Sequence, residues 1–240
     1  MKVLITGAAG LLGQNVARQL LERGDEVVAV DALNRFRLFG DETTCQPVPE
    51  ILRHERCLFV EADFADDDVF NLMREEEVDA VVHCAAATSH PRSIEAPAED
   101  FRINAVGTFR LLETLRAWSM VSDTMLRRKN APRLVFVGSA KVYGENVCDA
   151  TIDHPEAWDM RLAPMFQRDR HDVMPMFEGA SQYATEPAVS ERCPIGSGTI
   201  MTPFGVSKAA ADLYCQQYAK LYDLDIAILQ RADSQIPLQR

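Results

Sequence analysis

The chain has 240 residues, enough for one α/β domain or for one domain and a fragment. Hydrophobic residues make up 47% and charged residues 25%, which is the composition of an ordinary globular protein. The formal net charge of −11 argues against a nucleic-acid-binding surface, because such a surface needs a basic patch. The charge does not exclude an anionic ligand, since backbone N–H groups at a helix N-terminus can hold phosphate inside an acidic protein.

The cysteines and the apolar runs indicate an ordinary intracellular protein. The six cysteines form no C-x-x-C pair, and no histidine stands at zinc-like spacing. No apolar run is long enough to span a membrane, and glycines interrupt the apolar N-terminus where a signal peptide needs an unbroken core. We therefore expect a cytoplasmic protein with reduced thiols, no metal site, and no membrane or nucleic-acid partner.

Strands and helices alternate along the chain. It begins with a strand over 2–6, a helix over 11–24 that Gly24 ends, and a strand over 26–31. Further strands are predicted at 57–63, 79–86, 133–139 and 225–231, and further helices at 66–76, 98–119 and 203–222. The strands are continuously apolar, which predicts an α/β fold with a doubly wound parallel sheet and helices on both faces.

The helix predicted over 98–119 shows the apolar stripe that such a fold requires. The stripe consists of Phe101, Ala105, Thr108, Leu112, Leu115 and Trp118. Two stretches show no such period. Residues 32–56 are expected to form a loop with at most a short helix. Residues 145–202 hold five prolines and scattered charges, so they are either functional or disordered.

Three glycines lie between the first strand and the first helix, in "TGAAGLLG". Gly7 would permit the tight turn, Gly10 would let the backbone approach a pyrophosphate, and Gly13 would let the helix pack on the strand. Asp31 closes the second strand, where its carboxylate can accept from both hydroxyls of an adenosine ribose and would repel a 2′-phosphate. The sequence therefore predicts a Rossmann-like domain that binds NAD in preference to NADP. The alternative is a turn of small residues with a capping acid.

The ends of the third and fourth strands could complete a cofactor site. Asp63 could hold the adenine amino group with the Phe64 backbone beside it, or it could cap the following helix. Ala85 and Ala86 would leave room for a cofactor against the sheet, although small residues there also suit tight helix–sheet packing. Cys84 has apolar neighbours, which is typical of an inert buried thiol.

The assembled motifs resemble those of the extended short-chain dehydrogenase/reductase family, the NAD-dependent nucleotide-sugar epimerases and dehydratases. The matching segments are "TGAAGLLG", "VVAVD", "EADF", "HCAAATS", "INAVGTFRLLETLR", "VFVGSAKVYGE" and "PFGVSKAAADLYCQQYAKLYDLDIAILQR". They cover residues 1–147 and 202–231. The segments "SAKVYGE" and "PFGVSKAAADLYCQQYAKLY" favour the subgroup that resembles the CDP-tyvelose (CDP-paratose) 2-epimerases.

The resemblance implies a mechanism and a set of site residues. In the family, a Tyr takes a proton from a sugar hydroxyl while hydride passes to NAD. A Lys lowers the tyrosine pKa and binds the nicotinamide ribose, and a Ser or Thr orients the substrate. Ser139 stands at the Ser position, Lys208 at the Lys position, and Asn104 at a family asparagine near the end of the fourth strand. Further cofactor contacts are implied at Leu11, Leu12 and Asn34.

Phe204 departs from this pattern, because it occupies the place of the catalytic tyrosine. Phe204 and Lys208 are four residues apart and share one helix face, with Thr202 as the expected N-cap and Pro203 at the first helical position. A phenyl ring cannot ionise or donate a proton. General acid–base catalysis contributes ~10²–10⁴ in rate, so we expect at most weak activity by the usual route. The alternative for Phe204 is simple packing of an apolar ring.

Two further departures concern whole segments. Residues 145–202 stand where the family has a much shorter connection, and they could supply a substitute base or a lid. By their chemistry the candidates are His154, His171 and Tyr183, and the alternative, which we favour, is that each is a surface residue. The family's substrate domain is expected to be absent or vestigial, which leaves residues 1–240 as a single domain.

Three hypotheses therefore stand. The first is an NAD-dependent epimerase or dehydratase that works poorly or with a replacement base. The second is a catalytically impaired NAD- or nucleotide-binding protein, or a partner subunit. The third is a truncated remnant or an engineered fragment.

The resemblance also implies a homodimer. The helices over 102–119 and 203–222 would pair with those of a second copy to form a four-helix bundle. Their small residues Ala105, Gly107, Ala209 and Ala210 suit close packing at such an interface. The alternative is that these helix faces only cover the sheet.

Overall fold

A computed structural model describes residues 1–34, 48–122, 131–139, 141–143, 195 and 201–229. Most of the stretch 145–202 lies outside the described residues, and so do the candidate bases His154, His171 and Tyr183. The three cysteines within the described part of the chain, Cys57, Cys84 and Cys215, form no disulfide. None of the helices in the described ranges is long and apolar enough to cross a membrane.

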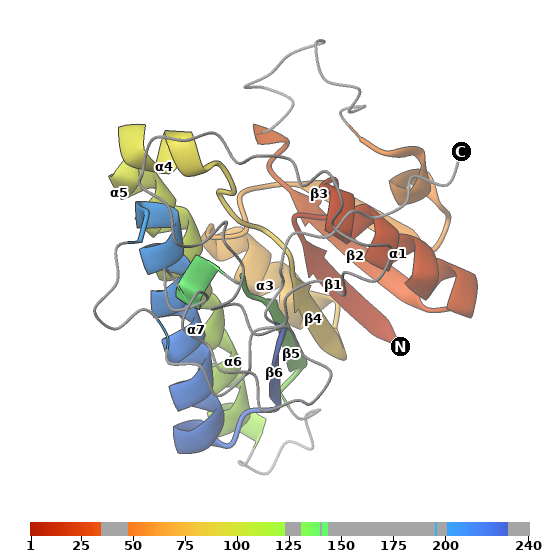
Figure 1. Ribbon diagram of the computed structural model, residues 1–240. Helices are drawn as coiled ribbons and strands as arrows, with labels where there is room; N and C mark the ends of the chain where they lie inside the picture. The colour runs from red at the N-terminus through yellow and green to blue at the C-terminus, as the bar shows by residue number, and fades with distance from the viewer. Residues whose placement is uncertain (35–47, 123–130, 140, 144–194, 196–200, 230–240) are drawn as a thin grey trace, which may run out of the picture.

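Six strands form one parallel sheet in the order β3-β2-β1-β4-β5-β6 (Figure 1). They are β1 (Lys2–Thr6), β2 (Glu26–Asp31), β3 (Cys57–Glu61), β4 (Ala80–His83), β5 (Arg133–Val137) and β6 (Ile226–Leu229). The chain proceeds outward from β1 to β3 and then crosses back to β4. The strand order therefore reverses between β1 and β4, and ligands of doubly wound sheets bind at the carboxyl ends of the strands at such a point. The predicted fold class is confirmed.

Helices cover both faces of this sheet. They are α1 (Leu11–Arg23), η2 (Glu50–Arg53), α3 (Asp67–Glu75), α4 (His90–Glu95), α5 (Pro97–Phe101), the π-helical η3 (Arg102–Gly107), α6 (Thr108–Ser122) and α7 (Pro203–Tyr222). One hydrophobic cluster joins α1 and η2 to the sheet through Ala17, Leu21 and Leu52. The larger cluster joins α3, α6 and α7 to the opposite face through residues such as Met73, Leu112 and Ala211.

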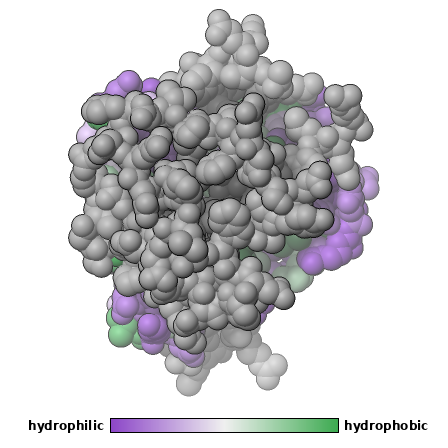
Figure 2. Space-filling view, in the orientation of Figure 1, coloured by the Kyte–Doolittle hydropathy of each residue, from purple (hydrophilic) through white to green (hydrophobic). Residues whose placement is uncertain are grey.

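The two helical layers differ in their outer surfaces. Hydrophilic residues gather on the outside of the molecule where α1 lies (Figure 2), and the exposed positions there include Arg18, Glu22 and Arg23. On the other side of the sheet, exposed apolar side chains remain on α7, among them Val206, at 48% exposure, and Leu221, at 70%. Within the described residues, the second layer therefore exposes more large apolar side chains than α1 does.

Three strands end earlier than the sequence predicted. β3 was expected to reach Asp63 and β4 to reach Ala86, but they end at Glu61 and His83, and β5 ends at Val137 instead of Ser139. One more backbone bond follows each end, such as that from the Cys84 N–H to the Thr6 carbonyl oxygen at 3.1 Å. Beyond it the backbone leaves the sheet. The site candidates that follow these three strands, Asp63, Phe64, Ala85, Ala86 and Ser139, therefore lie in loops at the carboxyl edge.

The long helix predicted over 98–119 is continuous but not uniform. It runs through α5, η3 and α6, and the short helix α4 precedes it. Placing Phe101 on the buried stripe was wrong, because its side chain is 49% exposed, whereas Ala105, Leu112 and Trp118 are buried. The π-helical turns explain the error. They use i→i+5 hydrogen bonds, so a residue before η3 is rotated away from the stripe that follows it.

The predicted helix ends are confirmed. Gly24 ends α1 in the left-handed conformation, with φ at 97°, and its N–H bonds the carbonyls of Leu20 and Leu21. Thr202 caps α7, its hydroxyl accepting from the Gly205 N–H at 3.4 Å, and Pro203 is the first helical residue. The short helix allowed within residues 32–56 is the 3₁₀ turn η2.

The small residues predicted to line a dimer interface mostly pack inside the protomer. A methyl group on Gly107 would lie 2.6 Å from Cζ of the buried Phe64, so η3 already presses against the loop after β3. Ala105 and Ala209 are each only 6% exposed, and Ala209 packs with Val142 in a separate cluster. Gly107 and Ala209 therefore pack against loops of the same protomer, and the alternative that these helix faces only cover the sheet is not decided by these contacts.

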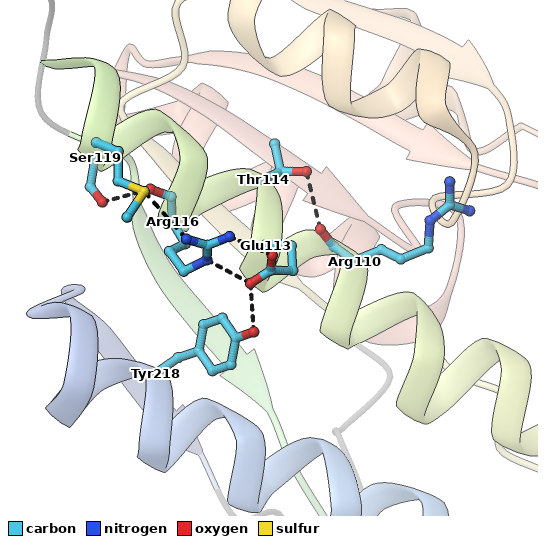
Figure 3. A network of polar contacts seen from close by, with 7 residues as sticks. Arg110, Glu113, Thr114, Arg116, Ser119 and Tyr218 are labelled. Carbon is cyan, nitrogen blue, oxygen red and sulfur yellow. Dashed lines mark hydrogen bonds and ion pairs between the residues drawn. The ribbon is translucent and has the colours of Figure 1, made fainter.

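A polar contact joins α6 to α7 (Figure 3). Glu113 on α6 accepts hydrogen bonds from the Tyr218 hydroxyl on α7 at 2.6 Å and from Arg116 Nε at 2.7 Å. The Arg116 guanidinium, followed by Tyr218, lowers the Glu113 pKa to about 2. The guanidinium also lies 5.4 Å from the ring centre of Tyr222. The two helices are therefore held in register by one shared carboxylate.

Candidate dinucleotide and active site

The three glycines between β1 and the first turn of α1 differ in how strongly the structure requires them. Gly7 has φ at 67°, and a methyl group on it would lie 2.7 Å from the Ala85 backbone nitrogen. A methyl group on Gly13 would lie 2.2 Å from the Gly7 carbonyl oxygen. Both glycines are therefore required by the fold. Gly10 has φ at −71°, and its nearest contact would be 3.2 Å, so its own backbone hardly demands glycine.

Helix α1 begins directly after this loop without a side-chain cap. Its first helical hydrogen bond runs from the Gln14 N–H to the Gly10 carbonyl at 3.0 Å. The N–H groups of Leu11, Leu12 and Gly13 belong to the first turn, where no carbonyl of the same helix is available. These donors, together with the helix dipole, fit a pyrophosphate.

Asp31 is fixed in place at the end of β2. Its two carboxylate oxygens accept from the backbone N–H groups of Ala9 at 2.9 Å and Leu33 at 2.8 Å. Burial raises the pKa of Asp31, and backbone hydrogen bonds from Leu33, Ala9 and Gly10 oppose that rise. The acid therefore ties the loop after β2 to the glycine loop. Asn34, the other predicted contact here, is exposed on the same loop.

Asp63 and Phe64 lie in the loop after β3. Asp63 accepts from the Ala65 N–H and pairs with Arg102 of η3, each at 3.0 Å. The alternative that Asp63 caps α3 is wrong, because the N-cap is Asp66. The Phe64 side chain is buried, and its ring centre lies 4.7 Å from that of His83.

The loop after β4 lies against the glycine loop. The Ala85 N–H donates to Thr6 Oγ1 at 3.2 Å, and the Ala85 backbone is what a side chain at position 7 would strike. Ala85 therefore packs tightly against the glycine loop, which differs from the helix–sheet packing named as its alternative. Ala86 and Cys84 are each partly buried. Asn104 holds the next residue in two directions, accepting from the Ala87 N–H at 2.9 Å and donating to its carbonyl at 3.1 Å.

A buried polar chain supports these loops, and the sequence reasoning missed it. His83 is 1% exposed, with Nδ1 2.6 Å from Thr6 Oγ1 and Nε2 3.1 Å from Thr108 Oγ1. Burial, and then the charge of Lys208, lower its pKa to about 3, so this imidazole is neutral. The Thr108 hydroxyl donates to the Asn104 carbonyl at 2.6 Å. These hydrogen bonds thus link β1 and β4 to Asn104.

The same network of buried hydrogen bonds continues into α5 and α7. Asn104 Nδ2 donates to Asp100 at 3.2 Å and contacts the Ser207 hydroxyl at 3.1 Å, and that hydroxyl donates to Asp100 at 2.5 Å. Asp100 and Ser207 are 3% and 1% exposed. One signal in the sequence could have indicated Asp100, because it lies one helical turn before Asn104.

Lys208 is buried beneath the carboxyl end of β5. Its Nζ donates to the Val137 carbonyl at 2.8 Å and lies 4.4 Å from the ring centre of Phe136. The side chain is 4% exposed, and burial lowers its pKa to about 8. Ser139 follows two residues after Val137, with its hydroxyl accepting from the Lys141 N–H at 3.2 Å. The structure therefore brings the predicted Ser and Lys to one strand end.

Phe204 lies one turn before Lys208, and it is 6% exposed. Its ring packs against His90 of α4, with ring centres 4.8 Å apart. The predicted geometry of the helix is confirmed, and so is the alternative of apolar packing for this ring. The sequence reasoning did not single out His90.

Across the described residues, no group of three His, Cys, Asp or Glu side chains could hold a metal ion.

The strand order, the glycine loop and the acid that ends β2 together define a Rossmann-type dinucleotide-binding domain. The model of the NAD dependent epimerase/dehydratase family matches residues 3–232, and the chain belongs to this family. The family predicted from the motifs is confirmed, and with it NAD as the family's cofactor.

Individual relatives agree with this assignment. The chain is 28% identical over 227 residues to a dTDP-glucose 4,6-dehydratase of Escherichia coli, covering 93% of this chain and 52% of the relative. It is 27% identical over 241 residues to a UDP-glucose 4-epimerase of Mycolicibacterium smegmatis, covering 100% and 58%. The chain thus spans about half the length of the curated relatives it matches.

Solved structures show the same fold. A UDP-glucose 4-epimerase from Thermotoga maritima, determined with UDP-glucose, superimposes with a TM-score of 0.61 at 22% identity, over 96% of this chain and 55% of that chain. A UDP-glucose-4-epimerase from Stenotrophomonas maltophila with bound NAD and formylated UDP-arabinopyranose gives 0.58 at 28% identity, over 96% and 52%. The likeness to the CDP-tyvelose 2-epimerase subgroup stays a prediction.

Proposed function

We propose that this chain binds NAD and acts on a nucleotide sugar by transient hydride transfer at a sugar carbon. The observation that carries the proposal is the buried Lys208, whose ammonium group donates to the Val137 carbonyl at the end of β5. Ser139 follows Val137 by two residues in the sequence. A buried lysine is costly unless it has a function or a partner. In the proposed site Lys208 binds the nicotinamide ribose, and Ser139 orients the sugar hydroxyl.

The proposed cofactor site uses the carboxyl edge of the sheet. The first-turn N–H groups of α1 hold the pyrophosphate, with Gly10 allowing its close approach. Asp31 and Asn34 hold the adenosine ribose, and Asp63 with the Phe64 backbone holds the adenine. The cofactor lies against Ala85 and Ala86, and Asn104 fixes the loop that carries them. When bound, NAD accepts a hydride from the sugar carbon and later returns it.

Relatives support the substrate class. Those named above are a dTDP-glucose 4,6-dehydratase and UDP-glucose 4-epimerases. Each acts on a sugar linked to a nucleoside diphosphate, as its name states. We therefore propose a nucleotide sugar as the substrate, without a choice among the sugars or nucleotides.

Single-turnover absorbance tests the proposal. The chain is loaded with NAD and mixed with CDP-, UDP-, GDP- and dTDP-sugars while the NADH band is followed. At least one sugar should raise this band, and Lys208→Met and Ser139→Ala should slow the rise. Glu22→Gln, on the outer face of α1, serves as the control. An NAD-bound chain that reduces no cofactor with any sugar would favour the alternative of an NAD-binding protein without turnover.

Calorimetric titration tests the cofactor. The chain should bind NAD more tightly than NADP, because the fixed Asp31 carboxylate accepts ribose hydroxyls and repels a 2′-phosphate. Asp31→Asn removes the charge, so NAD affinity should fall by about tenfold, close to the ~1.5–3 kcal/mol of a hydrogen bond to a charged group. The preference over NADP should narrow, while Glu22→Gln should bind as the parent does. Equal affinity of the parent for both cofactors would contradict this assignment.

We further propose that the protein is a cytoplasmic homodimer and that residues 145–202 are an insertion in its single domain. Exposed apolar side chains on one face of α7 support pairing with a second copy. They include Val206, Leu213, Tyr214 and Leu221. Spacings of seven, eight and fifteen residues from Val206 keep this set on one side of the helix.

A further inference from the structure

His90 is the ionisable side chain that the fold brings against the ring of Phe204. The two ring centres lie 4.8 Å apart, and the ring planes are tilted by 59°. His90 is the first residue of α4, which packs against α7, and its side chain is partly exposed. The imidazole therefore lies beside the ring that lacks the family's hydroxyl.

A hydrogen bond orients this imidazole. His90 Nδ1 lies 3.3 Å from Oγ1 of Thr202, the N-cap of α7. Thr202 Oγ1 also accepts from the Gly205 N–H, so the cap holds the hydroxyl in place. If Nδ1 carries the proton and donates it to Oγ1, Nε2 is the unprotonated nitrogen. Within the described part of the chain, no hydrogen bond engages Nε2.

We propose that His90 replaces the missing phenol as the proton acceptor of the site, with Thr202 as its positioning residue. The inference rests on the proposed function, hydride transfer from a nucleotide sugar. The sugar C–H bond breaks and its electron pair passes with the hydrogen to NAD⁺. The O–H bond breaks, its proton goes to Nε2 of His90, and the C–O bond becomes a carbonyl. The products are a keto sugar, NADH and an imidazolium whose Nδ1–H still donates to Thr202.

Two acids of α5, which packs against α4, have partners of their own. Glu99 pairs with Arg92 of α4 at 3.0 Å, and Asp100 accepts from the Ser207 hydroxyl at 2.5 Å. Neither contact involves the imidazole of His90.

NMR of the protein without ligands tests the proposed orientation of the His90 ring. Nitrogen-15 NMR of the His90 ring, assigned by its loss in His90→Gln, should show the proton on Nδ1. Thr202→Ser keeps the accepting hydroxyl and should keep this tautomer. Thr202→Val keeps the side-chain shape without the hydroxyl and should change it. A proton on Nε2 in the parent chain at neutral pH would overturn the assignment of Nε2 as the base.

Single-turnover NAD reduction tests the chemistry. His90→Gln should slow the reaction by ~10²-fold or more, because general base catalysis contributes ~10²–10⁴. Its NAD affinity should stay unchanged, and His54→Gln, a histidine beside η2, should react as the parent does. Adding Phe204→Tyr to His90→Gln should recover rate, since a phenol then lies one turn from Lys208.

Two outcomes separate this inference from the function on which it rests. If the double variant reduces NAD while the parent and His90→Gln react at equal rates, the proposed function stands and His90 is not the acceptor. If neither the parent nor Phe204→Tyr reduces NAD with any sugar nucleotide, the proposed function fails, and the inference fails with it.

Discussion

Gly10 is the N-cap of α1 and Gly13 lies in its first turn, and an added methyl group at either position would approach the Gly7 carbonyl oxygen at a very different distance. At Gly13 it would lie 2.2 Å from a backbone oxygen, and at Gly10 the nearest atom is 3.2 Å away. Gly13→Ala should therefore destabilise the fold by roughly 1–3 kcal/mol through overpacking. The free energy of unfolding of Gly10→Ala should lie within about 1 kcal/mol of the parent's. This variant should nevertheless bind NAD at least tenfold more weakly, because the methyl group blocks the pyrophosphate.

Urea unfolding and NAD titration of both variants check this pair. The decisive comparison is between stability and binding in Gly10→Ala. A variant that binds NAD as tightly as the parent would remove the ligand-based reason for Gly10.

Lys208 predicts how stability depends on pH. Burial lowers its pKa from 10.5 to about 8. Between these values the unfolded chain still holds a proton that the folded chain has released, so the free energy of unfolding rises with pH. Below about 8 the lysine is charged in both states, and the cost of burying the charge is fully present.

Comparison with Lys208→Met isolates this contribution. From pH 8 to 10.5, the parent should gain stability relative to the variant, by at most on the order of 3 kcal/mol. Urea unfolding across this pH range measures the difference. Parallel pH profiles for the two chains would show that the buried ammonium does not titrate as proposed.

At the scale of elements, one carboxylate ties α6 to α7. Tyr218→Phe removes the hydroxyl that donates to Glu113 and leaves the ring packed. The variant should lose about 1–2 kcal/mol of unfolding free energy, the range of a hydrogen bond to a charged group that is partly exposed. Tyr222→Phe is the matched control, because its ring, and not its hydroxyl, faces Arg116. Equal losses in the two variants, measured in urea, would contradict a specific role for the Tyr218 bond.

The sequence predicted elements well where their signal is local. Continuous apolar runs located all six strands, and Gly24 and Thr202 marked helix ends, because a strand core or a cap depends on neighbouring residues. The π-helical η3 was not predicted, since the i→i+5 bonds of that segment have no distinct pattern of residues. The error at Phe101 and the inward packing of Gly107 both follow from it.

The candidate site divides in the same way. Gly7, Asp31, Ser139 and Lys208 could be predicted because they belong to contiguous motifs at strand or helix ends. The contact of Thr202 with His90 spans 112 residues, and that of Ser207 with Asp100 spans 107. Neither has any periodicity, so only the folded sheet and its helices bring these pairs together.

At the scale of the whole molecule, the two helical layers have different outer surfaces. The outer face of α1 is hydrophilic (Figure 2), whereas α7 exposes large apolar side chains such as Leu213 and Leu221. Monomers rarely expose contiguous apolar patches of large size, so such a face on adjacent helices suits association. Because the small residues Ala105, Gly107 and Ala209 are used inside, the larger exposed residues are the ones available for contact.

The proposed dimer predicts the mass of the protein in solution and the residue whose substitution should separate the two copies. Light scattering at micromolar concentration should give twice the mass of the chain, because an isologous interface pairs the same face of both copies. Leu213 is 48% exposed in the middle of α7, so Leu213→Glu should yield monomers. The free energy of unfolding of the protomer should change by no more than about 0.5 kcal/mol, as is usual for a surface substitution. Leu58→Glu, on β3 and 44% exposed, is the control and should stay dimeric. A monomeric parent would refute the dimer. A dimer that survives Leu213→Glu but not Leu58→Glu would move the interface from α7 to the β3 edge of the sheet.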